Sequence, residues 1–332
     1  MAGSQERVLR RRIKSVQSTK KITRAMELIA ATRVAKAQQR ATAARPYSED
    51  LTSVMQHLAA NSGVVDHPLL KPAEQVSKVA FLVISSDRGL AGGYNSSVIR
   101  AAERELQARQ IEGVDYSLVL VGKKVDSYFR YRRYRVDHTF HGVSDAPTYE
   151  NAVDIGSVIS DLYISGEVQE VVLVFTRFIS LGQQQVAVRR FLPLTGVGQE
   201  TDETRATAGY EFEPAASKIL ESLIPRYITA RVYAALLDSA ASEHASRQRA
   251  MKSATDNAED LIVKLSRVMN RARQDSITNE IMEIVGGAEA LRQTQSDTSD
   301  LLVDHVFSPD PFNPVLAEAH ARPDHFSSGE PS

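Results

Sequence analysis

Apolar residues recur with helical spacing at the two ends of the chain. Near the N-terminus, Ile22, Met26 and Ile29 are separated by four and three residues, and the alternation resumes from Val34 in a series of alanines. This is the a and d pattern of a coiled-coil seam. The pattern predicts a helix over residues 4–60 that packs against another helix, with a kink at Pro46.

The C-terminal part of the chain predicts a longer helix. Residues 226–285 contain neither glycine nor proline, and at ~1.5 Å per residue such a run spans roughly 90 Å, more than a small domain can bury. Between Asp238 and Asp260 the only large apolar residue is Met251. We therefore expect a helix over residues 214–291 that forms a thin coiled-coil shaft and is surrounded by other chains.

The pattern changes in the middle of the chain. Short runs rich in β-branched residues alternate with stretches of helical periodicity, which indicates a mostly parallel sheet in an α/β domain over residues 76–195. A last strand, within residues 183–194, is expected to return antiparallel after a turn at Gly182. The other expected strands are 79–84, 116–121 and 171–175, and the expected helices are 96–110, 123–131 and 148–164.

Composition identifies the remaining segments. Residues 196–213 are polar and glycine-containing and are expected to form a linker, and residues 292–332 hold five prolines and seven acidic residues. Such a segment is typical of a disordered acidic tail. The N-terminal arm is the opposite, with twelve Lys and Arg against two acids in residues 1–45, although the net charge of the whole chain is only -1.

Several functional classes are excluded or disfavoured. The chain has no cysteine, which excludes disulfides, thiol catalysis and cysteine-based metal centres, and which is compatible with a reducing cytoplasm. It shows no secretory signal and no apolar run long enough to predict a transmembrane helix.

One loop is a candidate for enzymatic chemistry. Residues 85–95 form a glycine-rich loop between an expected strand and an expected helix, where α/β domains often bind phosphates. However, the spacing of Gly89, Gly92 and Gly93 does not match the dinucleotide fingerprint. An α/β nucleotide-binding enzyme that uses this loop remains an alternative.

Other candidates are weaker. Gly122-Lys123-Lys124 follows a strand but lacks the upstream glycine and the Ser or Thr of a phosphate-binding loop. His138 and His141, near Asp137 and Asp145, lack the helical context of a metal site, so we expect no metal, no cofactor and no catalytic residue.

The basic arm raises a further alternative, a nucleic-acid-binding coiled-coil protein. The arm has no aromatic residue before Tyr47 for base stacking, so the cations are better interpreted as facing an acidic protein surface.

The motifs along residues 5–291 resemble the gamma subunit of F-type ATP synthases, the central rotor stalk. The N-terminal signature VQSTKKITRAMELIAA occupies residues 16–31 and is followed by Arg45-Pro46-Tyr47. The loop SDRGLAGG occupies residues 86–93. The most specific motifs are AMKSATDNA at 250–258, RQDSITNEI at 273–281 and EIVGGA at 283–288.

The resemblance implies a fold and a function. The fold is α/β, with a long antiparallel coiled coil of the N- and C-terminal helices and a Rossmann-like α/β domain between them. The chain would be a non-catalytic rotor, one copy per complex, coupling proton translocation to ATP synthesis on the beta subunits. Its partners would be three alpha and three beta subunits, an epsilon subunit and the membrane c-ring, at the cytoplasmic side of the cell membrane, and nucleic acid would not be a partner.

The resemblance also assigns roles to residues. Contacts with the beta-subunit catch loops would come from Arg273, Gln274, Thr278 and Glu280, and an apolar bearing from Ile277, Ile281, Ile284 and Val285. Contacts with the lever segments of beta would come from Lys20, Lys21, Arg24, Met26, Asp87 and Arg88. The chain departs from the family pattern at Ala91, where many relatives have cysteine, at Asn279, where glutamine is usual, and in the tail after Leu291.

Overall fold

The computed structural model describes residues 2–61, 69, 73, 75–194 and 216–303. The chain forms two units, which we describe separately. One comprises Ser15–Ile262, and the other comprises Met1–Lys14 together with Val263–Ser332.

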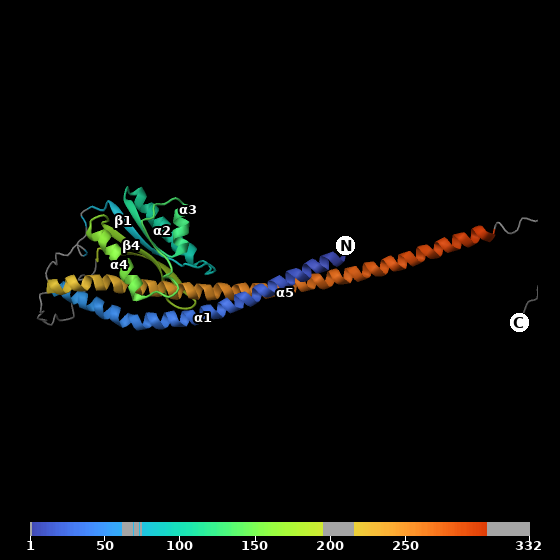
Figure 1. Ribbon diagram of the computed structural model, residues 1–332, viewed down its shortest axis with the longest axis horizontal. Coiled ribbons are helices and arrows are strands. Elements are labelled where there is room, and N and C mark those ends of the chain that lie inside the picture. Colours follow the sequence, from blue (N-terminus) through green and yellow to red (C-terminus); the bar gives the residue numbers. More distant parts are fainter. Residues whose placement is uncertain (1, 62–68, 70–72, 74, 195–215, 304–332) are drawn as a thin grey trace, which may run out of the picture. The chain divides into compact units, whose positions relative to one another are not determined.

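A five-stranded sheet organises the unit Ser15–Ile262 (Figure 1). Its order is β3-β2-β1-β4-β5; the first four strands run parallel and β5 pairs antiparallel with β4. This confirms the predicted α/β domain and its returning last strand. The short β3, which the sequence pattern did not predict, joins the edge beside β2. The strands are β1 (Lys78–Ile84), β2 (Asp115–Val121), β3 (His138–Phe140), β4 (Glu170–Phe178) and β5 (Gln184–Leu192).

Both faces of the sheet are covered, which explains why its central strands are apolar at nearly every position. Val79, Phe81 and Val83 of β1 point to one face, where they pack with α2 (Tyr94–Ile111) and α3 (Lys123–Tyr131). The alternate residues point to the other face and pack with α4 (Tyr149–Ile164) and with the long helices. The alternation follows from the two-residue period of a strand.

The long helices are α1 (Ala2–Asn61) and α5 (Ala216–Val303). Pro46 lies inside α1, so the helix continues through it as expected. α5 does not end at Leu291: it continues to Val303, and the expectation of disorder from residue 292 is wrong for this helical part. The expected linker 196–213 and the tail from residue 304 lie outside the described residues.

Within Ser15–Ile262 the two long helices run antiparallel. The hydroxyl groups of Thr23 and Thr255 lie 2.8 Å apart, and Lys20 Nζ lies 3.0 Å from Glu259 Oε1. As the residue number rises along α1, it falls along α5, which confirms the antiparallel coiled coil that the resemblance implies.

The first part of the α1 seam is shifted by one residue from the expected one. Ile22 and Ile29, predicted to face the partner helix, are 59% and 53% exposed. The buried positions there are Thr23, Glu27 and Ala30, which continue with the same four-three spacing to Val34 and Ala37, buried as predicted. Small and hydrogen-bonding residues let the two backbones approach closely, and this leaves the bulkier isoleucines on the flank.

No helix among the described residues is both long and apolar enough to cross a membrane.

Gly122, at the end of β2, is required by a close backbone approach. Its φ is +102°, and a Cβ there would lie 2.5 Å from the carbonyl oxygen of Ser85. We predict that Gly122→Ala lowers the free energy of unfolding by about 3 kcal/mol or more, because backbone must move. Gly113→Ala is the matched control: its φ is +80° but no atom lies within 4 Å, so only about 1 kcal/mol should be lost. Equal losses in urea unfolding would refute the steric explanation.

Candidate functional site

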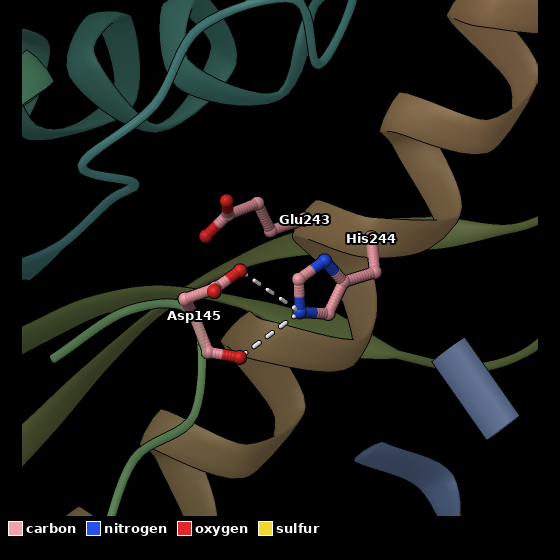
Figure 2. A group of neighbouring side chains, drawn as sticks. All are labelled: Asp145, Glu243 and His244. Carbon is pink, nitrogen blue, oxygen red and sulfur yellow. Dashed lines mark hydrogen bonds and ion pairs between the residues drawn. The ribbon is translucent and has the colours of Figure 1, made fainter. Parts of the chain in front are cut away.

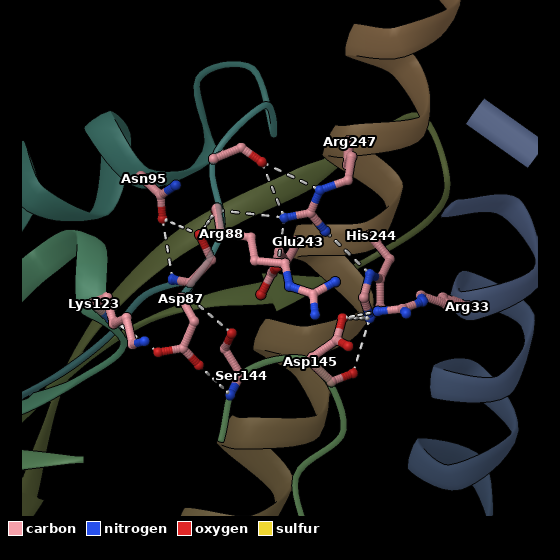
Figure 3. A network of polar contacts seen from close by, with 12 residues as sticks. Arg33, Asp87, Arg88, Asn95, Lys123, Ser144, Asp145, Glu243, His244 and Arg247 are labelled. Atoms are coloured by element: carbon pink, nitrogen blue, oxygen red, sulfur yellow. Dashed lines mark hydrogen bonds and ion pairs between the residues drawn. The ribbon is translucent and has the colours of Figure 1, made fainter. Parts of the chain in front are cut away.

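Residues from four segments of the chain meet where the α/β domain contacts the two long helices. They come from the loops that follow β1 and β3, from α1, and from one turn of α5 that holds Glu243, His244 and Arg247 (Figure 3). We call this group the joint. All of it lies within Ser15–Ile262.

A buried ion pair forms the centre of the joint. Arg247 Nη2 donates to Glu243 Oε1 at 2.6 Å, one helical turn away, and the two residues are 7% and 1% exposed. The same guanidinium donates to the carbonyl oxygens of Gly89 at 3.3 Å and Arg88 at 3.5 Å. Arg247 therefore attaches the glycine-rich loop of the α/β domain to α5.

His244 extends the joint to the loop after β3 (Figure 2). Its Nε2 lies 3.0 Å from the carbonyl oxygen of Asp145, and its Nδ1 lies 3.3 Å from Arg247 Nη1. A carbonyl only accepts and a guanidinium only donates, so the contacts require a neutral imidazole with the proton on Nε2. Burial is the main reason that the pKa of His244 is lowered, and a lowered pKa also favours the neutral form.

The carboxylate of Asp145 connects α1 to the joint. It accepts a hydrogen bond from the guanidinium of Arg33. Burial by itself would raise the pKa of Asp145, but the hydrogen bond and the charge of Arg33 outweigh it and lower the pKa. The joint thus connects both long helices to the domain through ionic and hydrogen-bonded contacts.

The joint also resembles a cation site. Asp145, Glu243 and His244 place potential ligand atoms within 4.8 Å of one another. Arg33 and Arg247, however, already balance the two carboxylates, and both nitrogens of His244 are in use. This donor set favours a structural network over a metal centre.

The glycine-rich loop uses its polar groups inside the chain. Asp87 accepts from the backbone N–H of Lys123 at 3.1 Å and of Ser144 at 3.3 Å. Ser85 Oγ accepts from the N–H of Val125 at 3.1 Å. The first amides of α3, which would have to bind a phosphate, are therefore already satisfied. This weighs against a phosphate site at Gly122-Lys123-Lys124.

The histidines near β3 do not form a site. His141 Nε2 lies 3.1 Å from Asp126 Oδ2, whereas Asp137 accepts from Ser117 Oγ at 2.7 Å and from the N–H of Leu118 at 3.0 Å. Asp145 belongs to the joint. Of the four residues considered together in the sequence, His141, Asp137 and Asp145 thus have different partners.

The residues expected to contact the levers differ in their availability. Lys20 pairs with Glu259 at 3.0 Å, and Arg24 pairs with Glu27 at 2.9 Å, although the Arg24 side chain is more than half exposed. Lys21 and Arg88 are exposed. Met26 is half-buried and lines a cavity of about 390 Å³ together with Ile29, Arg33, Arg88, Leu90, His244 and Arg247.

The unit that contains Val263–Ser332 presents the expected catch and bearing residues on α5. The side chains of Arg273, Gln274, Thr278 and Glu280 are exposed. The large apolar side chains Ile277, Ile281, Ile284 and Val285 are between 49% and 71% exposed. Ile277, Ile281 and Ile284 follow the spacing of one helix face. A face of this kind is typical of a surface that another chain covers.

Comparison with known proteins identifies the family. The family model described as ATP synthase matches residues 5–291. The ATP synthase gamma chain of Frankia casuarinae is 50% identical over 298 residues, covering 88% of this chain and 99% of that one. The gamma chain of Kineococcus radiotolerans is 48% identical over 303 residues, covering 89% and 99%.

Solved structures agree in fold. A chain in the Euglena gracilis mitochondrial ATP synthase, from a structure of OSCP, F1 and the c-ring, superposes with a TM-score of 0.61 at 18% identity, covering 88% of this chain and 96% of that one. A chain of the Tetrahymena thermophila central stalk and c-ring gives 0.54 at 22% identity, with 70% and 99% covered. The extent and identity of the sequence matches show that this chain belongs to the family of ATP synthase gamma chains, the non-catalytic central-stalk rotor subunits.

Proposed function

We propose that this chain, present as one copy, turns inside a hexamer of three alpha and three beta subunits and is driven by a membrane c-ring, with an epsilon subunit beside it. The complex would lie at the cytoplasmic side of the cell membrane. The observation that supports this assembly is the exposed apolar face of α5 at Ile277, Ile281 and Ile284. Such a face needs a surrounding surface of other chains.

Rotation would act on catalysis by population shift. An asymmetric shaft contacts each catalytic subunit differently, and therefore biases each toward a different nucleotide affinity. In this scheme the exposed Arg273, Gln274, Thr278 and Glu280 hydrogen-bond to the beta subunits, and Ile277, Ile281, Ile284 and Val285 turn in an apolar sleeve. Lys20, Lys21, Arg24, Met26 and Arg88 face the levers of beta.

Asp87 has a different proposed role from the other lever contacts. Its carboxylate accepts two backbone hydrogen bonds inside the chain, so we propose that it positions the loop that carries Arg88. The joint would then transmit torque, because Arg33, His244 and Arg247 attach the α/β domain to both long helices.

Purification from native membranes tests the assembly. An affinity tag at the N-terminus is expected to recover this chain with alpha and beta subunits at three copies of each, measured by quantitative mass spectrometry. Recovery of the chain without them would contradict the proposal. Nucleotide turnover by the isolated chain would instead favour an enzyme, and salt-resistant retention on phosphate polymers a nucleic-acid binder.

A further inference from the structure

Four arginines from four elements surround Asp238 on the unit Ser15–Ile262. They line two adjoining cavities of about 160 and 360 Å³, which share Arg177, Arg231 and Asp238. We call these two spaces together the Asp238 cavity. These four are Arg45 on α1, Arg177 on β4, Arg189 on β5 and Arg231 on α5. A fifth arginine of the lining, Arg190 on β5, is already paired with Glu170.

Arg45, Arg177 and Arg189 make no ion pair with another residue that the structure describes. Arg231 lies over the ring of Tyr227, 5.9 Å from its centroid. The adjacent Arg190, by contrast, pairs with Glu170 at 3.1 Å. Four guanidiniums thus face a single carboxylate, and the cavity has an excess of positive charge. If these arginines were only the solvated face of one helix, they would not come together from four different elements.

The lining suits a tetrahedral oxyanion. Guanidinium groups present N–H donors in a planar fork that matches phosphate oxygens. Arg45, Arg177 and Arg189 are exposed and open to a ligand from solvent, whereas Arg231 and Asp238 are half-buried. Apolar side chains of Phe175, Ala234 and Leu237 form other parts of the wall. They keep water away from one side of the bound anion, which strengthens the charge interaction.

We propose that the Asp238 cavity binds a small phosphate-bearing anion, whose oxygens accept hydrogen bonds from the surrounding guanidiniums. The bound anion would connect α1, β4, β5 and α5, and so would stiffen the contact between the α/β domain and the two long helices. This site is separate from the joint, which uses Arg33 and Arg247.

Calorimetric titration of the full chain with pyrophosphate at low ionic strength tests the proposal. Saturable binding at one site is expected. The double variant Arg177→Gln/Arg189→Gln should bind at least about tenfold more weakly, because each lost guanidinium removes charge-assisted hydrogen bonds. The matched control is Arg100→Gln/Arg104→Gln on α2, which removes two exposed arginines and should leave the affinity within about twofold.

Two results would overturn the proposal. One is the absence of saturable binding. The other is an equal loss of affinity in both double variants, which would show an effect of net charge alone. Vesicles of phosphatidylglycerol separate a lipid source of the phosphate from a free anion. Binding to vesicles that depends on Arg177 and Arg189, without binding of pyrophosphate, would also contradict a small free ligand.

The acidity of Asp238 provides a second, independent test. Burial raises the pKa of Asp238 to about 6, and the charges of Arg177, Arg45 and Arg189 only partly oppose this. The other charged groups that line the cavity are Arg231 on α5 itself and Arg190 on β5, which pairs with Glu170. Arginines keep their charge throughout this range, so only Asp238 titrates there.

Sulfate is the probe for this test, because it stays a dianion across the range. Since protonation removes a like charge from the site, sulfate should bind several-fold more tightly at about pH 5 than at about pH 7.5. Asp238→Asn should bind at the higher pH as tightly as the original chain does at the lower one. Thermal unfolding checks that this isosteric variant folds. An affinity for sulfate that does not change with pH in the original chain would contradict the assignment.

Discussion

Replacing Arg247 with methionine is expected to lower the free energy of unfolding by about 3–5 kcal/mol, because it leaves the carboxylate of Glu243 buried without its cation. Glu243 is 1% exposed, Arg247 contacts its Oε1, and its Oε2 has no hydrogen-bond partner among the described residues. The change also removes the donors to the carbonyl oxygens of Gly89 and Arg88. Urea unfolding followed by circular dichroism measures the loss.

A double variant distinguishes charge from packing. Arg247→Met with Glu243→Leu removes both charges, and most of the lost stability should return, because an apolar pair of similar volume costs little in place of a buried ion pair. Lys252→Met, at an exposed position of the same helix, is the control and should change stability by less than about 0.5 kcal/mol. If the double variant is less stable than Arg247→Met, the unpaired carboxylate of Glu243 is not the cause of the lost stability.

Replacing Met26 with lysine is expected to reduce the protons transported per ATP hydrolysed, while ATP hydrolysis itself continues. Met26 is half-buried beside Arg33, Arg88 and Arg247, so the new ammonium is repelled by its own chain and must turn outward. There it would pair with an acidic lever of beta in one rotor position, and the added attraction would hold the shaft at that position.

The measurement is the ratio of proton uptake to ATP hydrolysis in vesicles reconstituted with the purified complex. Met26→Leu conserves the volume and adds no charge, so its ratio should match that of the original complex. A normal ratio in the lysine variant would remove Met26 from the proposed lever contacts. The subunit stoichiometry of the complex is determined before the ratio is measured, so that loss of this subunit is detected.

The sheet could be predicted from the sequence because its strands are buried on both faces. Continuous apolar runs at β1, β2 and β4 leave little ambiguity, and the turn at Gly182 places the antiparallel β5. β3 was missed because three residues with half-buried side chains give no periodic signal.

The coiled coil was predicted correctly in existence and in its seam at Val34 and Ala37, but the seam between Ile22 and Ile29 was placed one residue off. Hydrophobicity favoured Ile22 and Ile29, whereas the partner helix lies against Thr23 and Ala30. A sequence pattern shows only which positions are apolar, whereas close packing of two helix backbones favours small residues. In addition, the hydroxyl of Thr23 forms a hydrogen bond with that of Thr255. The displaced isoleucines are then available to another chain.

The joint was missed because its members are far apart in sequence. Arg33, Asp145 and His244 come together only when the helices and the loops have their final positions. One local signal existed: Glu243, His244 and Arg247 interrupt a part of α5 made of alanines and serines. Charged residues at such positions of a helix, otherwise lined by small side chains, indicate a specific polar partner.

The antiparallel pairing of α1 and α5 has a consequence for the order in which the protein is made. The threonines that join the seam are 232 residues apart, and the α/β domain lies between them in the chain. Contacts of such separation form late, whereas helices and neighbouring strands form early. We therefore expect α1 to leave the ribosome without its partner and to remain unpaired until α5 has been synthesised, so that the shaft is the last part of the subunit to form.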